Sequence, residues 1–524
     1  MENKTKVLFT TEGTYPFHGG GVSTWAHSLC QDLEQEVDFI ILTLTSTPFL
    51  EFRYPLPSNV KDVIKVPLWG TEEPVQYYDR HTPFSDHIRR KARTTDEKIR
   101  EHFLPMFREF LDCLFEPFTT SRKFGELIYG FWKYYQHFDY KKTLSSRILW
   151  ENFKHRLSRE FDIFERQSRE LPRVFDMTFG MRWFYHFMMP LAVSIPDVNI
   201  THTTLAGFPS ISSIVAKYEY GIPMILTEHG VFIRERLINV SKNIEYPFFL
   251  KKMLINLSTF ITRAVYDHAD LIAPVTSVNE EWEQEYGAED KRIDAIYNGV
   301  DTDVFRPEKK PEHTANIPTV VAAAQVFPLK DIETMIRSCH LVRQKIPDVQ
   351  YILYGSLEVD PDYARKCQDL VKELDLSDHF TFGGYHDTPD MIYNEGDISI
   401  LSSISEGFPY TVIESMSCER PVVATDVGGI REALEGCGLL CKPRDAKALA
   451  EGVIKLLNND ELRFEMGKKA RERVLMNYTT RQTVNNYYNV YKKFDDFEQQ
   501  PLKENLTVSS VKNLVKSLEA KTYV

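Results

Sequence analysis

The chain has 524 residues, of which 43% are hydrophobic and 26% charged. This balance is typical of a globular protein, so extensive disorder and a fibrous repeat are excluded. The length suggests two large domains or about three smaller ones. With 63 basic and 75 acidic residues the formal charge is −12. Because such a chain repels a phosphate polymer, nucleic-acid binding is disfavoured.

Seven cysteines are scattered along the chain without a C-x-x-C pair, which favours free buried thiols over a zinc site or a disulfide framework. The first residues, MENKTKVLFTTEG, enter a strand pattern without an apolar signal segment. The most apolar stretch, Trp183–Val193, is short and is interrupted by His186 and Pro190, whereas a spanning helix needs about 20 apolar residues. We expect a cytoplasmic protein, and peripheral attachment to the inner face of a membrane stays open.

Short β-branched runs alternate with helical patterns in two series along the chain. The first series is Lys6–Thr10, Val37–Thr43, Asn199–Thr203, Met224–Thr227 and Leu271–Val275. The second series is Thr319–Ala323, Val349–Tyr354, His379–Phe382, Ile398–Leu401 and Val422–Thr425. Nearly continuous apolar strands between amphipathic helices predict parallel sheets covered on both faces. We therefore expect two doubly wound, Rossmann-like α/β domains.

The expected domain boundary lies in Tyr297–Pro318, which is rich in Pro, Gly, Asn and charge and lacks an apolar period. We predict an N-terminal domain over residues 1–305, a C-terminal domain over 306–480, and a helix and tail over 481–524 that pack back on the first domain. An aromatic-rich helical insertion is expected at about residues 77–196. Core helices explain its aromatic residues more simply than a membrane contact does, and partner binding by the insertion stays open. The tail segment Val508–Leu518 has apolar residues at helical spacing, and the pattern alone does not say what it packs against.

Three consecutive glycines follow the first predicted strand, in the segment Thr10–Trp25 (TTEGTYPFHGGGVSTW). Gly19, Gly20 and Gly21 open a helix, where backbone N–H groups and the positive end of the helix dipole suit phosphate oxygens. The segment is neither G-x-G-x-x-G nor a Walker loop. Taken alone, three glycines in a loop are more often just a turn than a phosphate site.

The segment Ser405–Gly429 (SEGFPYTVIESMSCERPVVATDVGG) carries the most specific pattern. Glu406 follows a buried strand, at the carboxyl edge where open α/β sheets bind ligands. Pro409 suits the first position of a helix, and Glu414 falls about one and a half turns into that helix. Two carboxylates so placed can accept hydrogen bonds from a polyhydroxylated ligand. The alternative is one acid near a helix N-terminus and one solvated helix acid.

This arrangement resembles the retaining GT-B glycosyltransferases of glycosyltransferase family 4, and YNGVD at Tyr297–Asp301 is similar to the segment that leads into their second domain. LFTTEGTYPFHGGGVSTWAHSL near the N-terminus and LTEHGVFIRER at Leu226–Arg236 resemble the PelF branch, cytosolic enzymes of exopolysaccharide synthesis that use a UDP-sugar. The resemblance runs from Lys6 to about Lys493. It implies a GT-B fold, in which two Rossmann-like domains face a cleft.

The resemblance also implies roles for individual residues. Glu406 would bind hydroxyls of the donor sugar, Glu414 those of the nucleotide ribose, and Lys330 the diphosphate. The implied donor-binding residues are Gly20, Gly21, Gln325, Lys330, Gly384, Glu406, Gly407, Phe408, Thr411 and Glu414. The implied catalytic residues are Glu406, Lys330 and His202, and the implied acceptor-side residues are Glu228, His229, Arg234 and Arg236. Without the resemblance, His202 is better explained as a satisfied core histidine, and the two arginines equally well as solvated surface.

One position departs from the pattern of similar sequences. An arginine usually precedes the lysine by five residues, whereas Gln325 stands here. An amide supplies no charge, and the loss of one donor to a developing diphosphate can cost about 3 kcal/mol. The Gly-rich phosphate turn after the next strand is also altered, to YGSLEVDPDY at Tyr354–Tyr363.

The predicted activity is transfer of a sugar from a nucleotide sugar, which is a substrate and not a cofactor, to a glycan or other hydroxyl acceptor. No metal is expected, since Asp301–Asp303 lies in the linker and Asp360–Asp362 contains Pro361, which favours a turn. Membrane-bound partners of polysaccharide synthesis are conceivable, and no nucleic-acid partner is expected. The alternatives are a nucleotide-sugar 2-epimerase of the same fold, and a degenerate transferase that serves as a binding or scaffold subunit.

Overall fold

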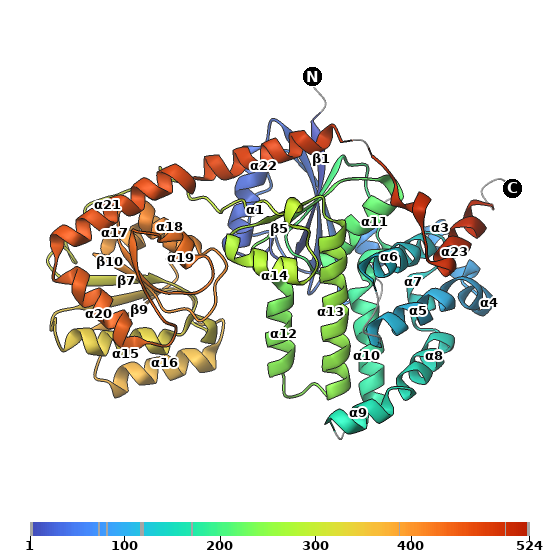
Figure 1. The fold of residues 1–524 in the computed structure, drawn as a ribbon, viewed down its shortest axis with the longest axis horizontal. Coiled ribbons are helices and arrows are strands. Elements are labelled where there is room, and N and C mark those ends of the chain that lie inside the picture. The colour runs from blue at the N-terminus through green and yellow to red at the C-terminus, as the bar shows by residue number, and fades with distance from the viewer. Residues whose placement is uncertain are drawn as a thin grey trace. The chain divides into compact units, whose positions relative to one another are not determined.

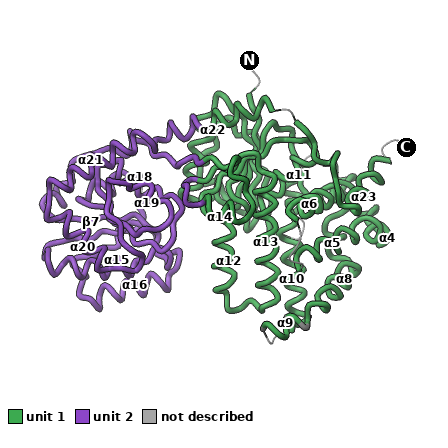
Figure 2. The backbone as a smooth tube through the Cα atoms, viewed as in Figure 1, with its two compact units in different colours: residues 1–274, 280–294, 488–524 green, residues 275–279, 295–487 purple. Residues whose placement is uncertain are grey.

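A computed structural model of the protein describes residues 4–71, 74–79, 82–115, 120–168, 171–386, 388–497 and 499–520. The chain forms two compact units (Figure 2). Unit 1 contains residues 1–274, 280–294 and 488–524, and unit 2 contains residues 275–279 and 295–487. Helix α22 (Thr480–Asp495) carries the chain from unit 2 back into unit 1 (Figure 1).

Unit 1 is built on a six-stranded parallel sheet with the order β3-β2-β1-β4-β5-β6. Its strands are β1 (Thr5–Glu12), β2 (Val37–Thr45), β3 (Val60–Pro67), β4 (Ile200–Thr203), β5 (Met224–Glu228) and β6 (Leu271–Pro274). The strand order reverses between β1 and β4, whose residues Val7–Thr10 pair with Ile200–Thr203. In an open parallel sheet, the carboxyl edge at such a reversal is where ligands bind.

Helices of unit 1 cover this sheet, and those from α2 to α10 form the helical region between β3 and β4. The helices are α1 (Gly21–Asp32), α2 (Val75–Tyr78), α3 (Phe84–Arg93), α4 (Asp96–Lys98), α5 (Leu104–Phe115), α6 (Ser121–Tyr135), α7 (Tyr140–Leu144), α8 (Arg147–Ser158), α9 (Phe161–Ser168), α10 (Val174–Phe187), α11 (Ile211–Tyr220), α12 (Phe232–Lys242), α13 (Phe248–His268), α14 (Glu280–Glu285) and α23 (Ser509–Glu519). A single turn of π-helix, Ile99–Phe103, leads into α5.

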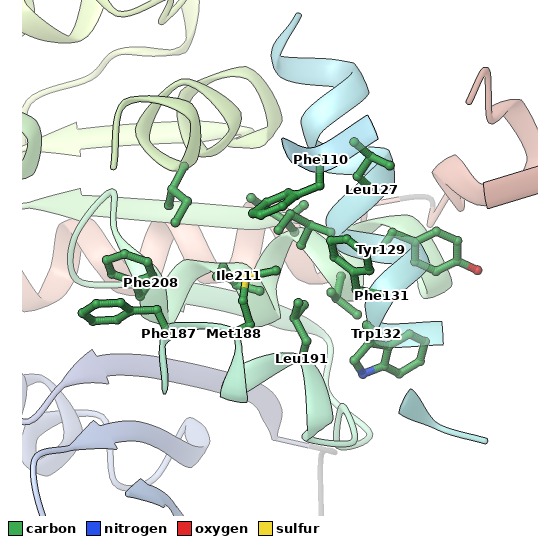
Figure 3. Close-up of a cluster of buried hydrophobic side chains, with 14 of the residues drawn as sticks. Phe110, Leu127, Tyr129, Phe131, Trp132, Phe187, Met188, Leu191, Phe208 and Ile211 are labelled. Atoms are coloured by element: carbon green, nitrogen blue, oxygen red, sulfur yellow. The ribbon is translucent and has the colours of Figure 1, made fainter. Parts of the chain in front are cut away.

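The aromatic helices of this region form the core of unit 1. Phe110 of α5 contacts Phe131 of α6, with ring centroids 5.5 Å apart, and Phe187 stacks on Phe208 at 4.1 Å. Figure 3 shows these rings packed with Leu127, Tyr129 and Ile211. Aromatic side chains bury large apolar areas, which explains why a helical region of this length is so rich in them.

The C-terminal segment packs on α6. The carboxylate of Glu126, which is fully buried, accepts hydrogen bonds from the backbone N–H groups of Thr507 and Val508, both at 2.7 Å. The hydroxyl of Thr507 donates to the same carboxylate at 2.8 Å. Helix α23 then buries its apolar stripe in unit 1: Val511, Leu514, Val515 and Leu518. Gly130 of α6 leaves the space that Val511 fills, because a Cβ there would lie 2.9 Å from Val511 Cγ2.

Unit 2 repeats the plan with the order β12-β11-β10-β7-β8-β9, again all parallel. Its strands are β7 (Thr319–Ala323), β8 (Gln350–Tyr354), β9 (Phe380–Gly384), β10 (Ile398–Leu401), β11 (Val422–Thr425) and β12 (Gly438–Cys441). Its helices, apart from the first half of α22, are α15 (Ile332–Arg343), α16 (Pro361–Glu373), α17 (Pro389–Glu395), α18 (Tyr410–Ser417), α19 (Ile430–Ala433), α20 (Ala446–Leu457) and α21 (Asp460–Asn477). Successive residues of β7 serve opposite faces: Val320 packs with α15 and α20, and Val321 with α17 and α18.

The two strands that the sequence did not predict, β3 and β12, are edge strands. In β3 the sequence VKDVIKVP mixes charged and apolar residues, and β12 is only half buried. The charged residues of β3 interrupt the continuous apolar run that marks a buried parallel strand, whereas the other two edge strands, β6 and β9, were predicted. None of the described helices is both long and apolar enough to cross a bilayer.

Candidate active site

The carboxyl edge of β10 in unit 2 brings together Lys330 and Glu406. The Nζ of Lys330 donates to Oε1 of Glu406 at 2.6 Å, and the hydroxyl of Ser403 donates to the same oxygen at 2.5 Å. Lys330 ends a 3₁₀ turn, Pro328–Lys330, whose last carbonyl accepts from the Ser402 hydroxyl at 2.9 Å. The loops after β7 and β10 thus hold a cation and a carboxylate against each other at the point where strand order reverses.

Glu414 lies on the following helix, α18, and is held separately. Tyr393 donates its hydroxyl to Oε2 of Glu414 at 2.6 Å. Burial raises the pKa of Glu414 to about 7, and the Tyr393 hydrogen bond partly opposes that rise. The helix begins at Tyr410, and Pro409 is its N-cap with φ −75° and ψ 124°, whereas the sequence placed Pro409 at the first helical position.

The segment between Glu406 and α18 is fixed by close backbone packing. A Cβ at Gly428 would lie 2.1 Å from the Glu406 carbonyl oxygen, and the N–H of Gly429 donates to the Gly407 carbonyl at 2.7 Å. The ring of Phe408 is buried against Tyr297 and Tyr478. Within the described part of the chain the backbone N–H groups of Gly407 and Phe408 have no hydrogen-bond acceptor. These donors and the first turn of α18, which includes Thr411, can receive an anionic group.

The other two predicted donor-side positions of unit 2 lie at neighbouring strand ends. Gly384 ends β9, and its carbonyl accepts from the N–H of Gly355 at 2.8 Å. Gln325 follows β7 and is exposed to solvent. The two Asp-x-Asp segments, 301–303 and 360–362, use their first aspartate to bind backbone N–H groups. Asp301 accepts from the N–H of Asp303, and Asp360 is the N-cap of α16. No cluster of three metal-ligating side chains occurs among the described residues.

In unit 1, the glycine loop connects β1 to α1. Gly20 has φ 130°, a conformation that favours glycine, and a Cβ there would meet nothing within 4 Å. Gly21 is the first residue of α1, and both glycines are exposed. The side chain of Arg53, from the loop after β2, lies over this turn, since a Cβ at Gly19 would be 3.0 Å from Arg53 Cζ. A cation therefore lies beside the open end of α1.

His202 lies in β4, near the carboxyl edge of the same sheet, and is fully buried. Its Nδ1 lies 2.6 Å from the Tyr491 hydroxyl and its Nε2 lies 2.8 Å from the Thr227 hydroxyl. Burial lowers the pKa of His202 to about 3, so the ring is neutral at pH 7. Trp25 of α1 contacts it with ring centroids 5.7 Å apart. In this geometry His202 has the hydrogen bonds of a satisfied core histidine.

Strand β5 ends in a buried acid, Glu228, and the next residue, His229, is half buried. Glu228 accepts from the Tyr266 hydroxyl at 2.6 Å and from the Phe232 N–H at 3.3 Å. It contacts the carboxyl of Glu283, which is likewise fully buried. His229 packs against Trp25 at 4.6 Å, and burial lowers its pKa to about 3. Glu228 thus faces an internal acid pair, whereas His229 joins His202 around the Trp25 ring.

The two predicted arginines lie in the first turns of α12. Arg236 donates to Glu12 at 2.9 Å and lies over the Phe232 ring, 5.1 Å from its centroid. Arg234 is half buried, and its Nε has no hydrogen-bond partner in the described residues. The two guanidinium groups therefore differ: the first pairs with an acid at the end of β1, and the second is available to an acidic or hydroxyl group.

Sequence reasoning missed several residues that shape these edges. Ser403 precedes Glu406 by three residues, and Trp25 belongs to the glycine-rich segment Thr10–Trp25. Both could therefore have been found by inspecting the residues next to these motifs. Tyr393, Arg53 and Glu283 come from elements remote in the sequence, and no local pattern marks them. Their places follow from tertiary packing alone.

Comparison with known families separates the chain into two matches. Residues 5–291 match the family described as "Domain of unknown function (DUF3492)". The chain belongs to the DUF3492 family. Residues 305–473 of this DUF3492 protein match the family "Glycosyl transferases group 1", so the Lys330–Glu406 pair lies within a group 1 glycosyltransferase domain.

The curated relatives align with about two fifths of the DUF3492 protein. It is 27% identical over 209 residues to N-acetyl-alpha-D-glucosaminyl L-malate synthase of Bacillus anthracis, covering 38% of this chain and 54% of that one. It is 27% identical over 226 residues to the putative glycosyltransferase EpsD of Bacillus subtilis, covering 41% of this chain and 58% of that one. The chain thus spans a little over half the length of these relatives.

Solved structures match almost the whole chain. A glycosyltransferase from Rickettsia africae superposes with TM-score 0.54 at 17% identity, covering 95% of this chain and all of that one. Anabaena Alr3699/HepE, solved in complex with UDP and glucose, superposes with TM-score 0.56 at 13% identity, covering 93% and 99% of the two chains. These likenesses, with two parallel six-stranded sheets, confirm the predicted GT-B fold and its helical region in the N-terminal part.

Proposed function

We propose that the protein is a retaining glycosyltransferase that moves a sugar from a UDP-linked donor to a hydroxyl of a glycan or other acceptor. The observation that carries the proposal is the Lys330–Glu406 pair at 2.6 Å, at the carboxyl edge of β10 in a domain that matches group 1 glycosyltransferases. The resemblance of the N-terminal segment to PelF supports a place in exopolysaccharide synthesis. The name of the HepE complex supports UDP as the nucleotide.

In this proposal unit 2 binds the donor. Lys330 has three N–H donors, of which one bonds Glu406, so the ammonium can bind a diphosphate oxygen and still hold the carboxylate. Glu406 accepts from hydroxyls of the sugar, and Glu414 accepts from the ribose. The N–H groups of Gly407 and Phe408 and the start of α18 add fixed positive potential where the leaving diphosphate gains charge.

Unit 1 binds the acceptor, with Arg234 and His229 as the groups that meet its hydroxyls. The acceptor oxygen forms a bond to the anomeric carbon on the face from which the phosphate departs. The bond from that carbon to the phosphate oxygen breaks, and the departing phosphate takes the hydroxyl proton. UDP and a glycoside of unchanged anomeric configuration result. Lys330 and the helix N-terminus supply the charge that a divalent metal supplies in other transferases.

The test is turnover by purified full-length protein with a panel of UDP-, GDP-, ADP- and TDP-sugars. Release of UDP with formation of an extended glycan is expected, and Glu406→Ala should abolish it while Lys345→Ala, an exposed lysine of unit 2, should not. UDP at about 100 times its dissociation constant should add about 2.7 kcal/mol of stability in a thermal-shift assay. An epimerised nucleotide sugar as product, or no binding of any nucleotide sugar, would refute the proposal.

A second candidate, a degenerate transferase that acts as a binding subunit, is favoured by Gln325, which is exposed after β7 where similar sequences carry arginine. If this candidate is right, the native protein binds UDP without turnover and Gln325→Arg restores activity. Strong turnover by the native protein excludes it.

A further inference from the structure

Unit 1 exposes a set of large apolar side chains where α10 begins and where α12 turns into α13. Phe175 is 72% exposed, Val174 65% and Ile244 95%. We call the set the α10–α13 tip: Leu171 before α10, Val174 and Phe175 in its first turn, Ile238 near the end of α12, and Ile244 in the turn from α12 to α13. Figure 1 shows these helix ends at the same end of unit 1.

Ring contacts connect Phe175 of the tip to Tyr246, which follows Ile244 by two residues. The centroids of Phe175 and Phe179 lie 6.4 Å apart, those of Phe179 and Trp183 6.2 Å, and those of Trp183 and Tyr246 6.3 Å. A Cβ at Gly180 would lie 3.2 Å from the Phe249 ring, so α10 and α13 touch here. Single exposed apolar residues are ordinary, but a contiguous exposed patch marks an interaction surface.

The charge around the tip is opposite in sign to that of the whole chain. In the described parts of residues 163–182 and 238–252 the basic residues are Arg166, Arg173, Arg182, Lys242, Lys251 and Lys252. The acidic residues there are Glu165, Asp176 and Glu245, of which Asp176 is paired with Arg173 at 3.2 Å. A positive region on a protein of charge −12 is complementary to a negatively charged partner.

We propose that the α10–α13 tip binds the surface of an anionic lipid bilayer. Ile244, Val174 and Phe175 enter the boundary between head groups and acyl chains, as apolar faces of interfacial helices do. Tyr246 lies at head-group depth, where a ring with one polar end is favoured. The surrounding lysines and arginines bind the lipid phosphates. Exposed aliphatic residues beside cations fit a lipid surface better than a glycan, which needs paired polar groups.

The experiment is co-sedimentation of the full-length protein with vesicles of phosphatidylcholine alone and with vesicles containing 30% phosphatidylglycerol. Binding is expected only to the anionic vesicles, and it should fall as salt rises. The variant Phe175→Asp/Ile244→Asp should bind at least about thirtyfold more weakly, because two apolar side chains no longer enter the lipid. Phe464→Asp, a change of a 67% exposed phenylalanine in unit 2, should bind like the native protein.

A second variant keeps the test decisive if Phe175→Asp/Ile244→Asp does not fold. Lys242→Glu/Arg166→Glu replaces two side chains on the protein surface and should lower binding to anionic vesicles at least about twentyfold. Equal binding to both vesicle types, or unchanged binding of both variants, would overturn the proposal. So would retention on immobilised glycan or a protein partner without vesicle binding. Sugar transfer to a soluble acceptor should be the same in native protein and variants, which separates this inference from the proposed function.

Discussion

Replacing Glu283 by Gln should remove a steep pH dependence from the stability of unit 1. Glu283 and Glu228 are both fully buried and in contact, and two such carboxyls cannot both be ionised at low cost. Burial, reinforced by the charge of Glu228, raises the pKa of Glu283 to about 10. The folded protein therefore retains a proton that the unfolded chain releases near pH 4.5.

The sign and size of the effect follow from linkage. The stabilisation by this proton is complete below the unfolded pKa and is lost as the pH rises towards the folded pKa, because only the folded state binds the proton. One retained proton costs on the order of 1 kcal/mol for each pH unit, so the native protein should lose stability steadily between pH 6 and pH 8 relative to Glu283→Gln. The amide of the variant still donates to Glu228 but does not titrate.

Urea unfolding at pH 6, 7 and 8 measures this difference. All six tryptophans lie in unit 1 (Trp25, Trp69, Trp132, Trp150, Trp183 and Trp282), so their fluorescence follows that unit alone. Glu285→Gln, an exposed acid two residues further along α14, is the control and should keep the native slope. Parallel pH profiles for the native protein and Glu283→Gln would refute the shared-proton argument.

Three further predictions concern the site and the tail. Lys330→Ala should lower kcat about 10²-fold, because one donor to the leaving diphosphate is lost, and a rise in KM with unchanged kcat in steady-state assays would contradict this role. Burial raises the pKa of Glu414 to about 7, so donor affinity measured by calorimetry should improve as pH rises from 6 to 8 and should be flat in Glu414→Gln. Glu126→Leu should destabilise unit 1 by about 3 kcal/mol in urea unfolding, because two backbone N–H groups lose a buried charged acceptor, whereas Glu109→Leu, on a half-exposed acid, should cost much less.

The sequence predicted the fold well because both sheets are parallel and buried on both faces. Each central strand reads as a short apolar run, such as VVAT in β11, and the flanking turns mark its ends. The edge strand β3 lacks such an apolar run, because its sequence contains Lys61, Asp62 and Lys65. The edge strands β6 and β9 were predicted all the same, so the charged residues of β3, more than its place at the edge, hid it from the sequence pattern.

The candidate site was predictable to a lesser degree. The motif around Glu406 named the carboxylate correctly as a strand-edge group, and the lysine that pairs with it came from the family resemblance. The partners that set each pKa could not be predicted, because Tyr393 and Tyr266 approach from other helices. His202 illustrates the limit: its hydrogen bond to Tyr491 joins residues 289 positions apart, and no local pattern contains that pair.

The return of the chain to unit 1 has a consequence for synthesis on the ribosome. The Glu126 carboxylate binds Thr507, and Val511 fills the groove at Gly130, so both contacts form only after these residues have been synthesised. Thr507 lies 381 residues after Glu126. At about 5–20 residues per second, the nascent first unit has for about 20–80 s an unfilled apolar groove and an internal carboxylate that keeps Arg122 but lacks the donors of Thr507 and Val508. Chaperone occupancy on stalled nascent chains should therefore persist until the final helix emerges from the exit tunnel.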